Sequence, residues 1–113
     1  MEKIVDLRTL QRPTMKLVLL DDANTTLRVA PPTVDMMDAL KEFQARIDEA
    51  DADNKKAEAV LYEMCAFVFS NNRDHIAVTA EELRGKYGVD PEAAELLFMA
   101  YLGFIEELKQ GKN

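Results

Sequence analysis

Cysteine and histidine are scarce in this sequence, which has one of each, Cys65 and His75, among 113 residues. A zinc site needs several such ligands at short spacings, so these two cannot supply one. Cys65 lies in an apolar stretch, where a lone thiol indicates core packing in a reducing compartment. His75 lies in a polar stretch without a serine or cysteine partner in any known motif, so we interpret it as a surface residue.

Other catalytic and ligand-binding patterns are also missing. No pair of carboxylates lies in an apolar setting that would separate their pKa values for acid–base work. The acidic run at Asp48, Asp51 and Asp53 lacks the glycine and the closing glutamate of a calcium loop. Gly85 and Gly88 do not have the spacing of a phosphate-binding loop. We therefore expect no enzyme activity, no cofactor and no small-molecule substrate.

Positive charge and long apolar runs are in short supply too. The net charge is −7 and the basic residues are not gathered together, which opposes binding to nucleic acid. The longest apolar run, Leu96 to Ile105, is half of the roughly 20 residues that a membrane-spanning helix needs. The N-terminal residues mix charges with apolar side chains and do not form a signal peptide. The sequence therefore predicts a cytoplasmic protein without a membrane partner.

A hydrophobic content of 48% is enough to build the core of one small domain. We expect an α-rich domain over residues 15–110, an N-terminal arm over 1–14 and a frayed tail over 111–113. The arm contains Ile4, Val5, Leu7 and Leu10. It could be mobile, or it could form an extended segment or short strand that docks on a neighbouring subunit.

The domain should begin with a β-hairpin. Lys16–Leu20 and Thr26–Ala30 are rich in β-branched and aliphatic residues, and the DDANT sequence between them is typical of a turn. Two strands are marginal alone, so the hairpin needs a helix or another strand beside it. Pro31 and Pro32 end the second strand, and an amphipathic helix should follow Thr33 and end near Ala50.

The stretch from Ala57 to Ser70 predicts a central helix, because it is apolar on almost every side. We expect Phe67 to lie in the core, so Phe67→Ala should cost roughly 3 kcal/mol or more. The fold class predicted is mostly α with a small N-terminal hairpin, in which about four helices pack around this helix.

The third and fourth helices have clear end signals. Ile76–Val78 should be extended, and Thr79 and Glu82 form a capping box that starts a helix over Ala80–Tyr87. Gly88 suits the left-handed conformation after a helix, and Asp90 with Pro91 starts the fourth helix. This order has the shape of a helix-turn-helix. However, its second helix begins with glutamates and is then apolar, so we interpret the motif as structural.

The fourth helix is apolar around its full circumference from Leu96 to Ile105. One interpretation is a second buried core helix. The other is that a face formed by Phe98, Tyr101, Leu102 and Ile105 is exposed on a monomer and makes a protein–protein contact. Tyr101→Glu separates the two, because it disrupts assembly at an interface and the fold in a core. Unpaired hairpin edges offer a second route to self-association.

The order of these pieces resembles a known family. MKLVLLDDANTTLRVAPPT, the helix directly after it, the acidic linker, a helix ending in FVFSNN and the TAEEL turn are similar to the tail assembly chaperones of long-tailed bacteriophages and related prophages. The resemblance extends over Met15 to Leu108 and includes no catalytic residues.

The resemblance implies a small, α-rich, self-associating factor in the bacterial host cytoplasm. Such proteins coat the tape-measure protein, recruit tail-tube subunits and leave before the virion is complete, and they often have a longer frameshifted form. The expected partners are therefore a homo-oligomer, the tape-measure protein and the tail-tube protein. A small acidic helix-turn-helix regulator and a structural tail-completion protein remain as alternatives.

Overall fold

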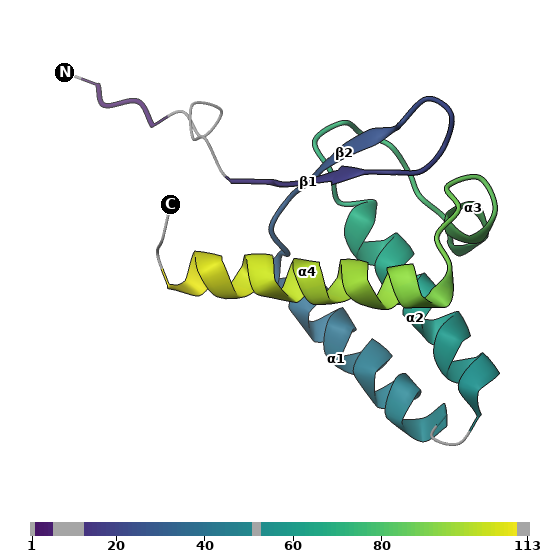
Figure 1. The fold of residues 1–113 in the computed structure, drawn as a ribbon. Helices are drawn as coiled ribbons and strands as arrows, with labels where there is room; N and C mark the ends of the chain where they lie inside the picture. The colour runs from purple at the N-terminus through teal and green to yellow at the C-terminus, as the bar shows by residue number, and fades with distance from the viewer. Residues whose placement is uncertain (1, 6–12, 51–52, 111–113) are drawn as a thin grey trace.

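The computed structural model describes residues 2–5, 13–50 and 53–110. Its elements, in chain order, are the strands β1 (Met15–Val18) and β2 (Thr26–Val29) and the helices α1 (Val34–Ala50), α2 (Asn54–Phe69), α3 (Ala80–Arg84) and α4 (Pro91–Lys109) (Figure 1). This confirms the mostly helical fold with an N-terminal antiparallel hairpin. The predicted frayed tail lies outside the described residues, as do residues 1 and 6–12 of the arm.

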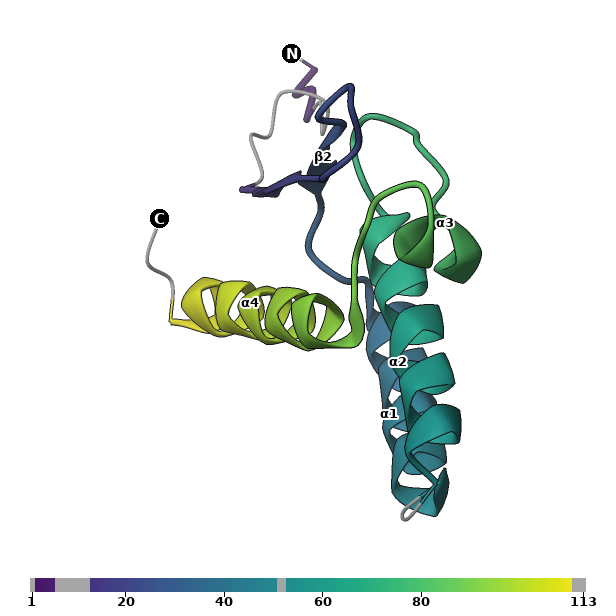
Figure 2. The same ribbon diagram turned by 45° about the vertical axis from the view of Figure 1, so that its right-hand side comes forward.

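The central position of α2 is confirmed, because this helix contacts α1, α3, α4 and β2. α1 and α2 lie side by side, and α4 extends away from this pair at a wide angle (Figures 1 and 2). Asp53 begins α2 by accepting a hydrogen bond from the Lys56 N–H. The buried side chains of α2 are Val60, Tyr62, Met64, Cys65, Ala66, Val68 and Phe69.

Phe67 is not part of this core. Its side chain is 36% exposed and contacts Phe43 of α1, with ring centroids 5.6 Å apart. The expectation that Phe67 lies in the core is therefore wrong. Phe67→Ala should cost less than the roughly 3 kcal/mol expected, because that loss requires a fully buried ring. Phe69, two residues on, is the fully buried phenylalanine of this helix.

The hairpin pairs Met15 with Val29 and Val18 with Thr26. Its inward side chains, Leu17, Leu19, Leu27 and Val29, are buried. The outer edge of β2 is covered by the segment after α2: the Arg73 N–H donates to the Arg28 carbonyl at 2.9 Å, and Val29 forms a bridge with Asn72. This segment supplies the additional strand-like support that the hairpin was expected to need.

Local signals placed the starts of α3 and α4 correctly. The Thr79–Glu82 capping box is formed, Asp90 caps α4 at its N-terminus, and Gly88 has a φ of +63°. α3 is shorter than predicted and ends at Arg84.

Residues 76–78, which were expected to be extended, lie outside any helix or strand. The Val78 N–H donates to the Ser70 hydroxyl at 2.9 Å, and that hydroxyl donates to the Val78 carbonyl at 3.0 Å. A side chain thus satisfies the backbone groups that a neighbouring strand would otherwise take.

Candidate protein-binding surface

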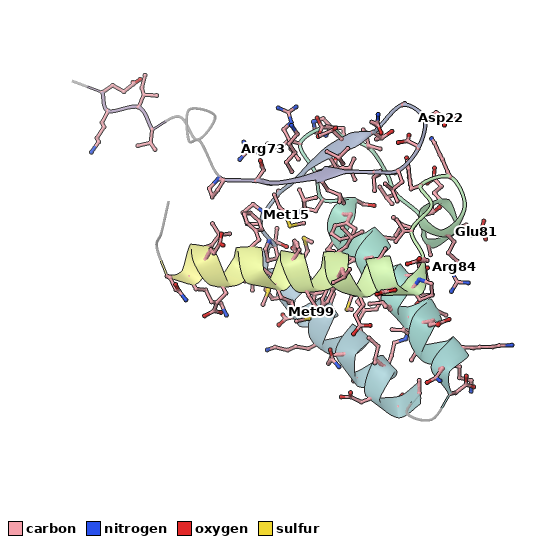
Figure 3. The ribbon with its side chains drawn as sticks, viewed as in Figure 1. Met15, Asp22, Arg73, Glu81, Arg84 and Met99 are labelled. Carbon is pink, nitrogen blue, oxygen red and sulfur yellow. The ribbon has the colours of Figure 1, made fainter. Side chains whose placement is uncertain are left out.

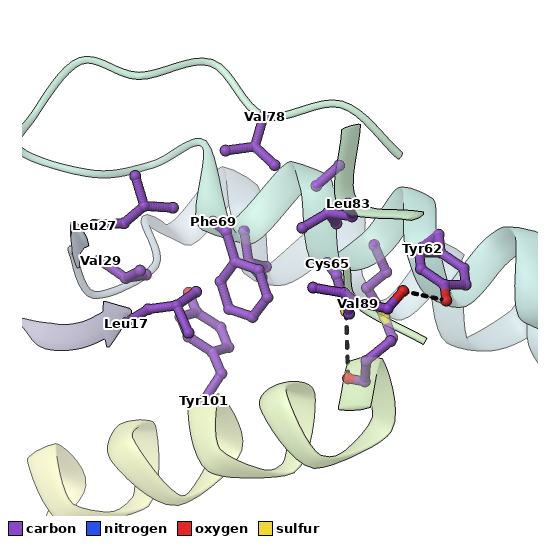
Figure 4. Close-up of a cluster of buried hydrophobic side chains, with 14 of the residues drawn as sticks. Leu17, Leu27, Val29, Tyr62, Cys65, Phe69, Val78, Leu83, Val89 and Tyr101 are labelled. Atoms are coloured by element: carbon purple, nitrogen blue, oxygen red, sulfur yellow. Dashed lines mark hydrogen bonds between the residues drawn. The ribbon is translucent and has the colours of Figure 1, made fainter. Parts of the chain in front are cut away.

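The inner side of α4 belongs to the core. Ala94, Tyr101 and Ile105 are buried, and they share one stripe because they are seven and four residues apart. Tyr101 meets the ring of Phe69 edge-on, with centroids 6.3 Å apart (Figure 4). The expectation that Tyr101 and Ile105 would be exposed on a monomer is therefore wrong, because this stripe faces α2 and the hairpin.

The other two predicted residues lie at the edge of this stripe. Phe98 is half-buried and Leu102 is 41% exposed. Together with Ile105 they form one wall of a groove of about 330 Å³ between α4 and α1. The rest of the apolar lining is Met37, Leu40 and Met64. We call this the α1–α4 groove.

Polar side chains surround the α1–α4 groove. Lys41 and Gln44 border it on α1, and Glu106 and Lys109 border it on α4. An apolar floor with a rim of both charges is the usual environment for one face of an amphipathic helix. The two methionines in the lining add adaptability, because their unbranched side chains repack easily around different partners.

A second hollow, of about 280 Å³, lies between β1 and the first half of α4. Its lining is apolar and consists of Leu17, Val18, Leu19, Leu20, Val89, Ala93, Leu96 and Leu97. Leu96 is 65% exposed, so the chain covers little of it. We call this hollow the β1–α4 groove.

The strand that borders the β1–α4 groove has an open edge. The Leu19 N–H donates to the Thr25 carbonyl at 2.8 Å, which fixes the residues of β1 whose backbone groups face β2. Because these groups alternate along an antiparallel strand, Lys16 and Val18 direct theirs to the opposite side. Within the described part of the chain, β1 pairs with β2 alone.

Three polar groups lie deep in the core. The Tyr62 hydroxyl donates to the Val89 carbonyl at 2.7 Å, and the Cys65 thiol donates to the Ala94 carbonyl at 3.6 Å (Figure 4). The Tyr101 hydroxyl finds no hydrogen-bond partner among the described residues. Burial raises the pKa of both Cys65 and Tyr101 to about 12. Both groups are therefore neutral near pH 7, and the thiol is inert, as expected of a core cysteine.

The charged residues with altered pKa values hold the hairpin in place. Hydrogen bonds from Arg28 lower the pKa of Asp74, and hydrogen bonds from Thr25 lower that of Asp21. Arg28 and Asp74 also form an ion pair of 2.8 Å. Figure 3 shows the side chains around the hairpin, with Asp22 in its turn and Arg73 in the segment behind it.

The described residues do not form a metal site, and His75 lies on the surface. His75 is exposed, with a φ of +56°. Over the residues that the structure describes, no group of His, Cys, Asp or Glu side chains could hold a metal ion. No described helix is long and apolar enough to span a membrane.

The sequence analysis did not predict the β1–α4 groove. It also did not predict that residues of α1 line the α1–α4 groove. The spacing from Ala94 to Tyr101 to Ile105 could have identified the inner stripe of α4. In the structure, Gly103 marks the outer side of α4, because a Cβ added there would meet nothing within 4 Å.

Comparisons of the chain with models of protein families, with curated proteins and with solved structures gave no match.

Proposed function

We propose that this protein is a tail assembly chaperone of a long-tailed bacteriophage or prophage, a non-enzymatic factor that acts in the bacterial cytoplasm. In this role it self-associates, coats the tape-measure protein and recruits tail-tube subunits. Two things support the proposal: the resemblance over Met15 to Leu108, and the apolar surface that α4 leaves uncovered on two sides.

The α1–α4 groove is the observation that carries the proposal. Phe98, Leu102 and Met37 line a hollow between two helices that has Lys41 and Glu106 at its rim. A tape-measure protein is a long helical chain, and its amphipathic segments would place apolar residues on the floor and charged ones at the rim.

The alternative of a DNA-binding regulator finds less support. α3 has five residues, and the exposed side chains at the start of α4 include Glu92 and Glu95. These carboxylates would face phosphate oxygens if α4 were a recognition helix. The net charge of −7 adds to this repulsion.

The proposal is tested by co-expressing the chain with a tape-measure protein from the same genome and measuring the affinity of the purified pair. Leu102→Glu should weaken binding at least tenfold, because it puts a carboxylate on the apolar floor. Leu96→Glu is the matched control: it makes the same change on the same helix outside the α1–α4 groove, and it should leave this affinity unchanged.

Circular dichroism of both variants must show that α4 remains folded. The proposal fails if the wild-type chain does not bind the tape-measure protein. It also fails if the chain binds duplex DNA with a steep dependence on salt, because that dependence is typical of phosphate contacts.

A further inference from the structure

The β1–α4 groove has a strand edge along one wall and apolar side chains of α4 along the other. Among the described residues, no strand pairs with the N–H and C=O groups that Lys16 and Val18 direct to that edge. Ala93 and Leu97 lie across the hollow. A segment in extended conformation can satisfy both walls at once: its backbone continues the sheet and alternate side chains enter the groove.

The chain also has two neighbouring apolar side chains, Ile4 and Val5, that lie outside its own core. Residues 2–5 are described, and Ile4 and Val5 are 77% and 73% exposed. Figure 1 shows this segment well to the left of the hairpin and helices. Met15, the first residue of β1, is ten positions after Val5, and ten residues of extended chain reach about 33 Å.

We propose that the N-terminal segment 2–5 of a second copy of this chain docks in the β1–α4 groove as a third strand beside β1. This deepens the self-association in the proposed function and rests on it. Each copy would give its arm to one neighbour and receive an arm from another, or two copies would exchange arms.

Ile4 and Val5 of the segment would lie on opposite faces of the extended sheet. Side chains alternate along a strand, so Val5 enters the groove when Ile4 lies on the outer face beside Val18. When the added strand runs parallel to β1, Glu2 then comes near Lys16. Opposite charges at neighbouring positions of a sheet favour this pairing.

A neighbouring copy is a better source than the chain's own arm. In the folded chain, Ile4 and Val5 are 77% and 73% exposed, so the chain's own segment does not fill its groove. The same groove on a second copy is open to this segment, because Leu96 on its wall is 65% exposed.

Disulfide trapping tests this directly, because buried Cys65 gives little background reaction. Ile4→Cys protein is mixed with Val18→Cys protein under mild oxidation, and a cross-linked dimer of the two variants should form. Ala23→Cys is the matched control: Ala23 is exposed in the hairpin turn, away from the proposed pairing, so its mixture with Ile4→Cys should cross-link at least tenfold more slowly.

The doubly substituted chain, with Cys at both 4 and 18, separates the two sources of the arm. A disulfide within a single molecule that forms independently of protein concentration would overturn the proposal in favour of the chain's own arm. Equal cross-linking of the Val18 and Ala23 variants, or none with either, would overturn it as well.

Light scattering over a range of concentrations gives the second measurement. Val5→Asp should weaken self-association at least tenfold and more than Ile4→Asp. Val18→Pro should weaken it similarly, because its N–H faces away from β2 and the hairpin bonds are kept. Val18→Thr keeps the N–H and the branched side chain, so it should associate like wild type. A strictly monomeric wild type, or equal association of all variants, would refute the docking.

The two proposals can fail separately. Binding of one tape-measure segment by one copy depends on Leu102 and should survive Val5→Asp. If cross-linking fails while Leu102→Glu still abolishes that binding, the arm docking is wrong and the proposed function stands. If the chain associates through its arm but does not bind the tape-measure protein, the proposed function is wrong.

Discussion

Replacing Tyr101 by phenylalanine should stabilise the protein. Tyr101 is fully buried, and its hydroxyl has no partner among the described residues. Such a group loses its bond to water on folding and gains nothing in return, which costs about 1–3 kcal/mol. Phenylalanine removes the oxygen and keeps the ring that packs edge-on against Phe69. We expect a gain of about 1 kcal/mol in the free energy of unfolding, or roughly 3–6 °C in Tm.

Tyr62→Phe is the matched control. Tyr62 is also buried, but its hydroxyl donates to the Val89 carbonyl at 2.7 Å. The same substitution there removes a hydrogen bond and leaves a buried carbonyl unpaired, so it should lower the free energy of unfolding by about 1–2 kcal/mol. Opposite signs from one chemical change would identify the hydroxyl's partner as the cause.

Urea unfolding followed by circular dichroism measures both variants. Their m-values should equal that of wild type, since neither change alters the surface exposed on unfolding. If Tyr101→Phe destabilised the protein as much as Tyr62→Phe, the hydroxyl of Tyr101 would have to bond a group within the native protein, and the reasoning from its burial would be refuted.

Three further predictions concern the core, the hairpin and the helix ends. Phe69→Ala should lower the free energy of unfolding by about 3–5 kcal/mol in urea titrations, because it removes a fully buried ring. The pKa of Asp74 is lowered by Arg28, so the stability from this pair is present above pH 3.8 and is lost as the pH falls through the lower folded-state value. Asp74→Asn should therefore be less stable than wild type at pH 7 and lose less stability between pH 4 and 2, as measured by urea midpoints. Gly88→Ala should destabilise by about 1–2 kcal/mol because φ is +63°, whereas Gly103→Ala should stabilise by up to about 1 kcal/mol, since it is helical with open space around it; thermal melts compare the two.

The parts of the fold that could be predicted are those determined by a few neighbouring residues. Thr79 with Glu82, Asp90 with Pro91, and Gly88 each satisfy backbone groups or a backbone conformation within a few residues of themselves. Such local signals do not depend on what the helix packs against. The hairpin could be predicted in the same way, because its turn and its two apolar runs lie within one continuous stretch of sequence.

The parts that could not be predicted depend on contacts distant in sequence. In α2, apolar residues occupy nearly every side, and nothing in the local pattern shows that Phe67 meets α1 while Phe69 meets α4. The Ser70 hydroxyl bonds to Val78 across a loop, which removed the need for a strand there. When a helix is apolar on every side, the sequence can indicate that the helix forms, but it does not indicate which side faces which neighbour.

In α4, the orientation of the helix faces decides which residues can bind a partner. Hydrophobicity alone placed Tyr101 and Leu102 on one interface, yet the first is fully buried and the second is 41% exposed. Tyr101→Glu would bury a carboxylate beside Phe69 and unfold the protein, so any loss of assembly in that variant would say nothing about an interface. Leu102 and Leu96 lie on different exposed sides of the same helix, so substituting them separates partner binding from self-association. The residues to be substituted in a binding experiment therefore have to be selected by their exposure in the folded chain. Otherwise a loss of binding cannot be distinguished from a loss of the fold.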